Sequence, residues 1–318
     1  MCIRDRDYGS ARWVNIDQKG GGRYLAENHS YAKQSVAHNT LVINEISHYE
    51  GKVKKAEANH PEQYFFDSSD PNIHAVRAKE MHAYPDVEMH RTLFLLKDEN
   101  FRNPLLIDVF RVASEKENQY DLPTWFQGHL LSANFEYEAQ TQQLTTLGNA
   151  HGYQHLWKEA SGKSDGKGNQ VTWFRHLNNG GGQKTRGKFF TLTTSSQSDD
   201  ELIFVRAGAN DPNFNLRHDP AFIQRRKGTS TVFASVIEAH GTYNPVSEIP
   251  MSPFSGVQSV LVLHDSKEYT VIKITHQSGK TWTVAIANED TNEMSDHQVK
   301  KGNEVMEWEG VFGIKIEN

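Results

Sequence analysis

The sequence predicts an all-β protein, built as a large antiparallel β-sandwich of extended sheets. In many short segments apolar and polar residues alternate with a period of two, which is the pattern of strands that bury one face. Clusters of Gly, Asn, Asp and Ser, which are typical of turns, separate these segments. No segment of the 318 residues shows a convincing helical period, so the short strands favour packed antiparallel sheets.

The alternating segments run along the whole chain and are expected to form the strands. They cover residues 40–44, 73–81, 88–96, 105–112, 134–139, 171–176, 189–194, 202–206, 231–238, 257–264, 270–276 and 281–288. Turns or surface loops are expected at residues 98–100, 162–168, 178–182 and 277–279.

A Pro-bearing segment at residues 244–253 suggests a division of the chain. It separates a main sheet domain, residues 7–245, from a β-meander, residues 246–318, that packs on it. Because the meander is small for an independent fold, a single domain is the alternative.

Composition and charge exclude several classes of function. Hydrophobic residues make up 36% and aromatic residues 10%, and the mean hydropathy of -0.68 is typical of sheets with one wet face. The net charge of -6 argues against a nucleic-acid binder, although local basic clusters could still bind an acidic polymer. No apolar run has the length of a membrane helix, and the start of the chain lacks the apolar stretch of a signal peptide. A single cysteine, Cys2, excludes an internal disulfide.

Chemically versatile side chains gather near the start of the chain, in residues 7–50. Asp7 and His38 supply a carboxylate oxygen and an imidazole nitrogen, both of which suit zinc. Their separation along the sequence is not a local metal-binding signature, and two ligands do not complete a site. Capping and hydrogen bonding in a loop are the alternative interpretation of both residues.

Arg12 and Tyr24 flank a glycine run at residues 20–22, and His29 follows shortly after. Glycine allows the backbone to approach a ligand closely or to adopt positive φ. Arginine is suited to bind a carboxylate, and tyrosine or histidine can transfer a proton. A flexible loop with an exposed arginine is the alternative, and the residues alone leave both interpretations open.

Two further segments could contact a sugar. Residues 206–226 concentrate Arg and His, and they could face an acidic glycan or form a solvated loop. His129 follows Trp125 and Phe126, whose rings could stack on a sugar or belong to the core. The chain contains no G-x-S-x-G elbow, no phosphate loop, no H-E-x-x-H and no C-x-x-C pair.

Several motifs follow one another in a characteristic order. The first are DYG, ARW, GGGRY and SVAHNTLVINE, and the later ones are MHRTLFLL, PLLIDVFRV, QYDLPTWFQGHL, RAGANDPNFNLRHDPAFIQRR and TVFASVIEAHGTYNP. This order resembles the β-sheet half of the heparinase II/III-type polysaccharide lyases, and within that group it is most similar to the oligoalginate lyases. The resemblance extends over residues 7–318, and its first cluster is the most specific part.

The resemblance implies a β-supersandwich that follows an N-terminal helical toroid, which is absent from this chain. It also implies a zinc ion held by two histidines and an aspartate. The DYG and HNT motifs match Asp7 and His38 to two of these ligands, while the third belongs to an upstream segment that this chain lacks. Zinc is therefore expected to bind weakly or not at all. Arg12 matches a binder of the uronate carboxylate, Tyr24 matches an active-site tyrosine near the scissile bond, and His29 is a further candidate for substrate binding.

From this resemblance we expect the C-terminal module of a lyase that cleaves alginate or oligoalginate by β-elimination. The same module of a heparin or glycosaminoglycan lyase and a non-catalytic sandwich that binds acidic glycans are the alternatives. The chain alone is expected to be inactive, because the main catalytic tyrosine and an Asn-His pair belong to the toroid. Its short start, MCIRDR, is interpreted as an arbitrary start of a fragment. The expected partner is an acidic, uronate-containing polysaccharide rather than nucleic acid or membrane, a homodimer is compatible with the family, and a periplasmic or secreted location follows from family habit.

Overall fold

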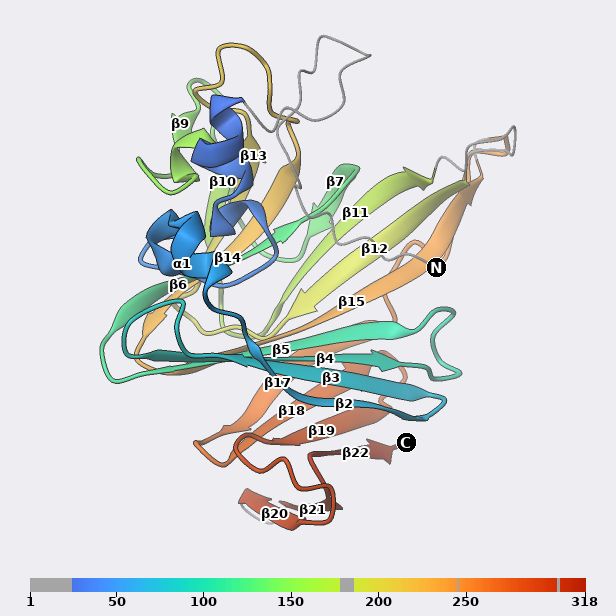
Figure 1. The fold of residues 1–318 in the computed structure, drawn as a ribbon. Coiled ribbons are helices and arrows are strands. Elements are labelled where there is room, and N and C mark those ends of the chain that lie inside the picture. Colours follow the sequence, from blue (N-terminus) through green and yellow to red (C-terminus); the bar gives the residue numbers. More distant parts are fainter. Residues whose placement is uncertain (1–24, 178–185, 245, 302–303) are drawn as a thin grey trace.

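The computed structural model describes residues 25–177, 186–244, 246–301 and 304–318. Within these ranges the chain forms three β-sheets and a separate hairpin, and its helical segments are at most 5 residues long (Figure 1). The paired strands run antiparallel. The predicted all-β fold of large antiparallel sheets is therefore confirmed.

The first sheet carries the segment in which the candidate site lies. It is 7-stranded, in the order β1-β6-β14-β13-β10-β8, with β9 paired to β10. Its strands are β1 (Val42–Ile43), β6 (Asn118–Trp125), β8 (Glu138–Ala139), β9 (Thr145–Thr146), β10 (Leu156–Lys163), β13 (Glu201–Ala207) and β14 (Pro220–Gly228).

The second sheet lies at the centre of the molecule and is 9-stranded, in the order β2-β3-β4-β5-β15-β12-β11-β7, with β16 paired to β15. Its strands are β2 (Glu62–Asp70), β3 (Ile73–Glu80), β4 (Val87–Leu96), β5 (Leu105–Ser114), β7 (His129–Ala133), β11 (Asn169–Leu177), β12 (Arg186–Thr194), β15 (Thr231–Asn244) and β16 (Ile249–Met251).

The remaining strands form a 4-stranded sheet, β17-β18-β19-β22, and a 2-stranded hairpin, β20-β21. Their bounds are β17 (Val257–Asp265), β18 (Tyr269–His276), β19 (Thr281–Ala287), β20 (Asp296–Lys301), β21 (Glu304–Glu309) and β22 (Phe312–Glu317). The short helical segments are η1 (Asn28–Ala32), η2 (Ser35–Ala37), η3 (His48–Gly51), α1 (Val53–Glu57) and η4 (Tyr153–His155). None of the helices in the described part of the chain is long and apolar enough to cross a membrane.

Separate apolar clusters join these layers. Between the first and second sheets, Phe204 and Phe222 pack with Trp173 and Leu192. On the opposite face of the first sheet, a cluster that includes Ile203 is covered by the segment that contains η1 and η2. This cover is what places the candidate site on the outside of the first sheet.

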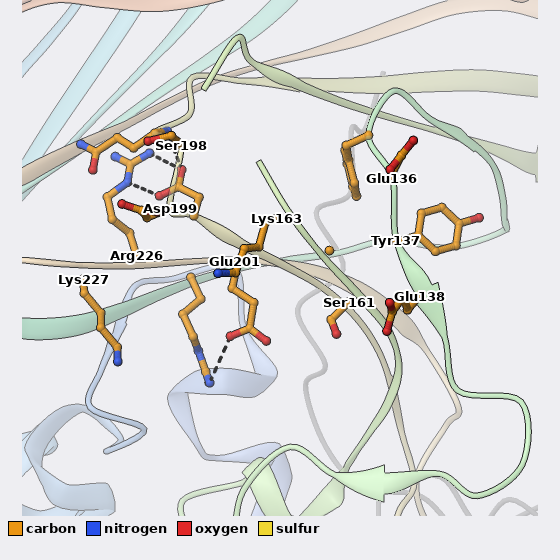
Figure 2. Close-up of a pocket in the computed structure, with 15 residues that line it drawn as sticks. Glu136, Tyr137, Glu138, Ser161, Lys163, Ser198, Asp199, Glu201, Arg226 and Lys227 are labelled. Atoms are coloured by element: carbon orange, nitrogen blue, oxygen red, sulfur yellow. Dashed lines mark hydrogen bonds and ion pairs between the residues drawn. The ribbon is translucent and has the colours of Figure 1, made fainter. Parts of the chain in front are cut away.

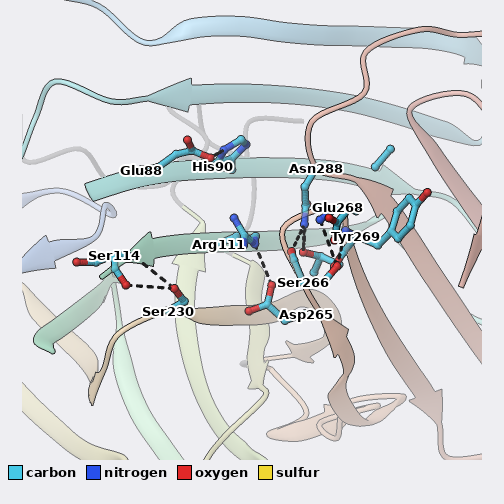
Figure 3. A network of polar contacts seen from close by, with 12 residues as sticks. Glu88, His90, Arg111, Ser114, Ser230, Asp265, Ser266, Glu268, Tyr269 and Asn288 are labelled. Carbon is cyan, nitrogen blue, oxygen red and sulfur yellow. Dashed lines mark hydrogen bonds and ion pairs between the residues drawn. The ribbon is translucent and has the colours of Figure 1, made fainter. Parts of the chain in front are cut away.

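The 9-stranded sheet and the 4-stranded sheet of the C-terminal region share one core. Leu105 and Val236 of the 9-stranded sheet belong to the same buried cluster as Ile272 and Trp282 of the 4-stranded sheet. Polar contacts cross the same interface, where Arg111 Nε lies 2.9 Å from Asp265 Oδ1 (Figure 3). The division into residues 7–245 and 246–318 stays a prediction.

The sequence did not indicate every strand. The period of two is weak in β6 and β14, because both faces of these central strands are covered and their polar side chains are paired inside the fold. The expected strand at residues 134–139 is wrong over most of its length, since only β8 is formed there. The expected strand at residues 40–44 is limited to β1.

Candidate functional site

Asp7, Arg12 and Tyr24 lie outside the described residues, and their roles stay predictions. The other candidates, His29 and His38, are described. Both belong to one segment, which forms η1 and η2 and covers the outer face of the 7-stranded sheet.

His29 projects from η1, a π-helical turn, and its side chain is exposed. Its neighbours Asn28 and Tyr31 are buried and anchor the turn. The Tyr31 ring makes edge contacts with Trp125 and His155, at centroid distances of 6.2 Å and 5.8 Å. Such turns are rare and occur frequently at functional sites. The backbone of η1 is thus held in place by its buried residues, and the His29 side chain projects from it into solvent.

His155 connects η1 to two other segments. It is 6% exposed, and its ring nitrogens contact Ser30 Oγ at 2.9 Å and the Ala209 carbonyl oxygen at 3.0 Å. Because a carbonyl can only accept, Nδ1 donates to Ala209 and Nε2 accepts from Ser30. Burial lowers the pKa of His155 and so favours this neutral form. Sequence reasoning missed His155, because an isolated histidine gives no signal of such contacts.

His38 follows η2, and its Nε2 lies 3.0 Å from the carbonyl oxygen of Ala32. Nε2 therefore carries the proton, and Nδ1 is the acceptor atom of the ring. A histidine that binds a metal usually donates its second ring nitrogen to an oxygen in this manner. The ring of His38 is thus held in a form that suits a metal ligand at Nδ1.

Asn39 fixes the turn after His38 to the sheet. Its side-chain oxygen accepts a hydrogen bond from the backbone nitrogen of Trp125 at 2.7 Å. Its carbonyl accepts from Arg91 at 2.7 Å, and Arg91 also pairs with Asp108 at 2.6 Å. The segment with His38 is therefore attached both to β6 and to β4.

The two arginines of β14 are paired with acids inside the fold. Arg226 is 4% exposed, and its Nη2 lies 2.6 Å from Asp200 Oδ2. Arg225 Nε lies 2.7 Å from Asp121 Oδ1, and its Nη2 lies 2.8 Å from Glu45 Oε1. The interpretation of residues 206–226 as one solvated loop is therefore wrong for both arginines, and their charge is not free to attract a glycan.

A polar cleft of about 1240 Å³ lies where β13 begins and β14 ends. In Figure 2, Tyr137 lies on one side of it, Lys163 and Glu201 lie near its middle, and Lys227 lies on the far side. Its buried cation, Arg226, is already neutralised within the fold. The cleft therefore offers polar groups of both signs rather than a concentrated charge.

The two aromatic residues before His129 belong to the core. Trp125 and Phe126 are each 4% exposed. Trp125 donates its ring N–H to the Val36 carbonyl at 2.8 Å, and Phe126 packs against Trp173. A sugar platform formed by these two rings is therefore excluded, whereas His129 itself is exposed.

One group among the described residues could hold a metal ion, because ligand atoms of Glu88, His90 and Glu289 lie within 4.8 Å of one another. Figure 3 shows Glu88 and His90 side by side. However, Lys79 Nζ lies 3.0 Å from Glu88 and 3.5 Å from Glu289. Arg77 donates to Nδ1 of His90, so Nε2 carries the proton that it shares with Glu88. The positive charge of Lys79 and the proton on Nε2 of His90 both oppose metal binding in this arrangement.

The fold of large antiparallel sheets is one that a polysaccharide lyase of known structure shares. The chain belongs to the heparinase II/III-like family, since the family's C-terminal model matches residues 6–275. The predicted family is thereby confirmed.

Two relatives are alginate-type enzymes. The chain is 37% identical over 305 residues to an alginate lyase of Stenotrophomonas maltophilia, covering 96% of this chain and 39% of the relative. It is 35% identical over 312 residues to an exo-oligoalginate lyase of Saccharophagus degradans, covering 98% of this chain and 41% of the relative. The chain thus spans well under half the length of these curated relatives.

A solved structure shares the fold. A heparan sulfate lyase of Pedobacter heparinus superposes with a TM-score of 0.52 at 10% identity, covering 90% of this chain and 35% of that one. At this identity the likeness concerns the fold alone.

Proposed function

We propose that this chain is the C-terminal module of a lyase that cleaves alginate or oligoalginate by β-elimination. The observation that supports this most directly is the identity of 37% and 35% to two alginate-type lyases over nearly the whole chain. The anchored segment with His29 and His38 is consistent with one wall of a substrate site.

β-Elimination removes the C5 proton of a uronate and expels the oxygen at C4. The proton becomes acidic enough only when the neighbouring carboxylate is neutralised, and a planar guanidinium does this well. In the proposed site Arg12 binds the carboxylate and His29 contacts the sugar. Tyr24 exchanges a proton near the scissile bond, and the remaining catalytic groups come from the helical part that the family places upstream.

The residues present fit zinc in part. His38 has the tautomer and the carbonyl partner of a metal-ligating histidine, and Asp7 is the second proposed ligand. When bound, zinc would hold the loops with Arg12 and Tyr24 in place. With one ligand supplied from outside this chain, the isolated module should hold zinc weakly.

Turnover is measured as the ultraviolet absorbance of the unsaturated product. The isolated chain should give no signal on oligoalginate, and the same module joined to an upstream toroid should turn it over. In that longer protein Arg12→Ala should lower kcat/KM by about two orders of magnitude, comparable with loss of one oxyanion donor, without changing the unfolding midpoint. Turnover of heparan sulfate in place of alginate would instead support a glycosaminoglycan lyase.

Localisation and assembly complete the proposal. We infer a periplasmic or secreted location from the family habit, and cell fractionation tests it. A homodimer is also proposed on that basis, and sedimentation of the purified chain distinguishes it from a monomer.

A further inference from the structure

We propose that the cleft beside the corner between β6 and β7, together with a neighbouring row of rings, binds the outer sugars of an acidic oligosaccharide. The identity of the ligand as a uronate oligomer rests on the proposed lyase function. The site itself rests on a cleft, an exposed row of rings and contacts that connect both to the segment with His29 and His38.

The cleft has a volume of about 660 Å³ and lies between the β6–β7 corner, β10, β13 and the start of β14. Phe126 and Phe204, which are only 4% and 6% exposed, form an apolar floor. Its walls carry the polar residues Gln127, His129 and His218 and the charged residues Glu159, Arg206 and Asp219. An apolar floor with a few placed polar groups is the usual composition of a small-ligand site.

The corner that forms one wall has a fixed backbone. Gly128 has φ of +112°, and a Cβ there would lie 2.0 Å from the carbonyl oxygen of Phe174. Only glycine fits this approach. Gln127 and His129, on either side, make no side-chain hydrogen bond within the described parts of the chain, so their polar atoms are available to a ligand.

Three rings continue from the cleft along the surface. His218, which lines the cleft, lies 5.6 Å from Trp157 and 6.4 Å from Phe214 between ring centroids. Phe214 is 55% exposed, although the next residues, Asn215 and Leu216, are 4% and 1% exposed. Exposed rings of this kind provide flat apolar surfaces against which the carbon face of a pyranose can pack.

The loop holds Phe214 in an unfavourable conformation. Its φ of 55° lies in the left-handed region, which costs a non-glycine residue about 1 kcal/mol. Asp211 Oδ2 accepts from the backbone of Leu216 at 2.7 Å, and Asn215 donates to Glu27 at 3.1 Å. Strained residues held by their surroundings cluster at ligand sites, so the exposure of Phe214 is consistent with a binding role.

The arginine at the edge of the cleft is paired with an acid. Arg206 is half-exposed, and its guanidinium bonds Glu159 at 2.6 Å and the His218 carbonyl at 3.1 Å. Because Glu159 offsets this charge, the ligand is held mainly by hydrogen bonds and ring packing. Modest affinity is therefore expected for each sugar.

Both walls of the cleft are attached to the candidate site. Asn39, next to His38, bonds the backbone of Trp125, which leads directly into the corner. On the other side Ser30, next to His29, is connected through His155 to Ala209, at the base of the loop with Phe214. These contacts fix the position of the cleft relative to the segment with His29 and His38.

The test is calorimetric titration of the chain, and of the longer lyase, with a long oligoalginate and with its disaccharide. Phe214→Ala should weaken binding of the long oligomer by about fivefold, as expected for the loss of one ring contact, and leave the disaccharide unchanged. Gln127→Ala should act in the same direction. Phe254→Ala is the matched control, because Phe254 is 82% exposed but does not line the cleft, and it should have no effect.

Thermal unfolding checks that each variant remains folded. Unchanged binding of the long oligomer by both Phe214→Ala and Gln127→Ala would overturn the inference and leave the lyase proposal intact. A long heparan oligosaccharide that binds in place of oligoalginate, with the same loss in Phe214→Ala, would support the cleft and refute the alginate substrate. No binding of any acidic oligosaccharide by the parent proteins would overturn the inference.

Discussion

Hydrogen-bond partners of single histidines decide which of them can bind a metal. His38 donates through Nε2 to Ala32, so a metal ligand of this ring has to be Nδ1, whereas His90 accepts from Arg77 at Nδ1. In zinc titrations His38→Ala should therefore lower the affinity of the protein for zinc at least about tenfold. About tenfold is the lower end of the loss seen when a residue that only hydrogen-bonds a metal ligand is replaced. His90→Asn should not change the affinity. The reverse result would place the metal in the group around Glu88.

His90 also makes stability depend on pH. Burial, with the charge of Arg77 second, lowers the pKa of His90 from 6.5 to about 3. Below pH 6.5 His90 therefore binds a proton in the unfolded chain but stays neutral in the folded chain. Its contribution to the free energy of unfolding is present above pH 6.5 and is lost as the pH falls. Between pH 6.5 and 4.5 this loss should approach about 1.4 kcal/mol per pH unit.

Urea midpoints measured across this pH range check that expectation. The urea midpoint of His90→Asn should depend less on pH than that of the parent chain, because the variant lacks the imidazole whose pKa is lowered by folding. Equal slopes for the two proteins would show that His90 is protonated in the folded state.

At the scale of elements, the sequence predicted strands in which apolar residues alternate with polar ones. The strand at residues 73–81 corresponds to β3 (Ile73–Glu80), and that at residues 105–112 lies within β5 (Leu105–Ser114). β14 was not predicted, because its arginines indicated a charged loop, and their buried acid partners come from distant parts of the chain. Such pairs leave no local pattern. The candidate site was likewise predicted from motifs of a family, since nothing in the spacing of Asp7 and His38 specifies a metal site.

The pair of Arg226 with Asp200 should be essential for β14. Both side chains are buried, with 4% and 0% exposure, so Asp200→Ala leaves a guanidinium without its counter-charge. The free energy of unfolding should fall by about 3–5 kcal/mol. Lys116→Ala is the control: its partner Asp86 is 67% exposed, and loss of that pair should change stability by less than about 1 kcal/mol. Urea unfolding of the two variants makes the comparison, and a similar midpoint in both would contradict a structural role for the buried pair.

At the scale of the whole molecule, the shared core predicts that the C-terminal meander is required for folding. Removal of residues 246–318 would expose the face of the 9-stranded sheet that now packs on Ile272, Trp282 and Val284. Each large apolar side chain that loses its cover forfeits about 1.5–3 kcal/mol. Among the described residues the shared core holds seven such side chains of the 9-stranded sheet, so the total loss is about 10–20 kcal/mol, as large as the roughly 5–15 kcal/mol of typical stability. The fragment 1–245 should therefore be unfolded or aggregated by circular dichroism and light scattering, whereas the parent chain should unfold in one transition. A soluble, cooperatively folded fragment would show instead that the meander is a separate domain, as the proline-bearing segment before it suggests.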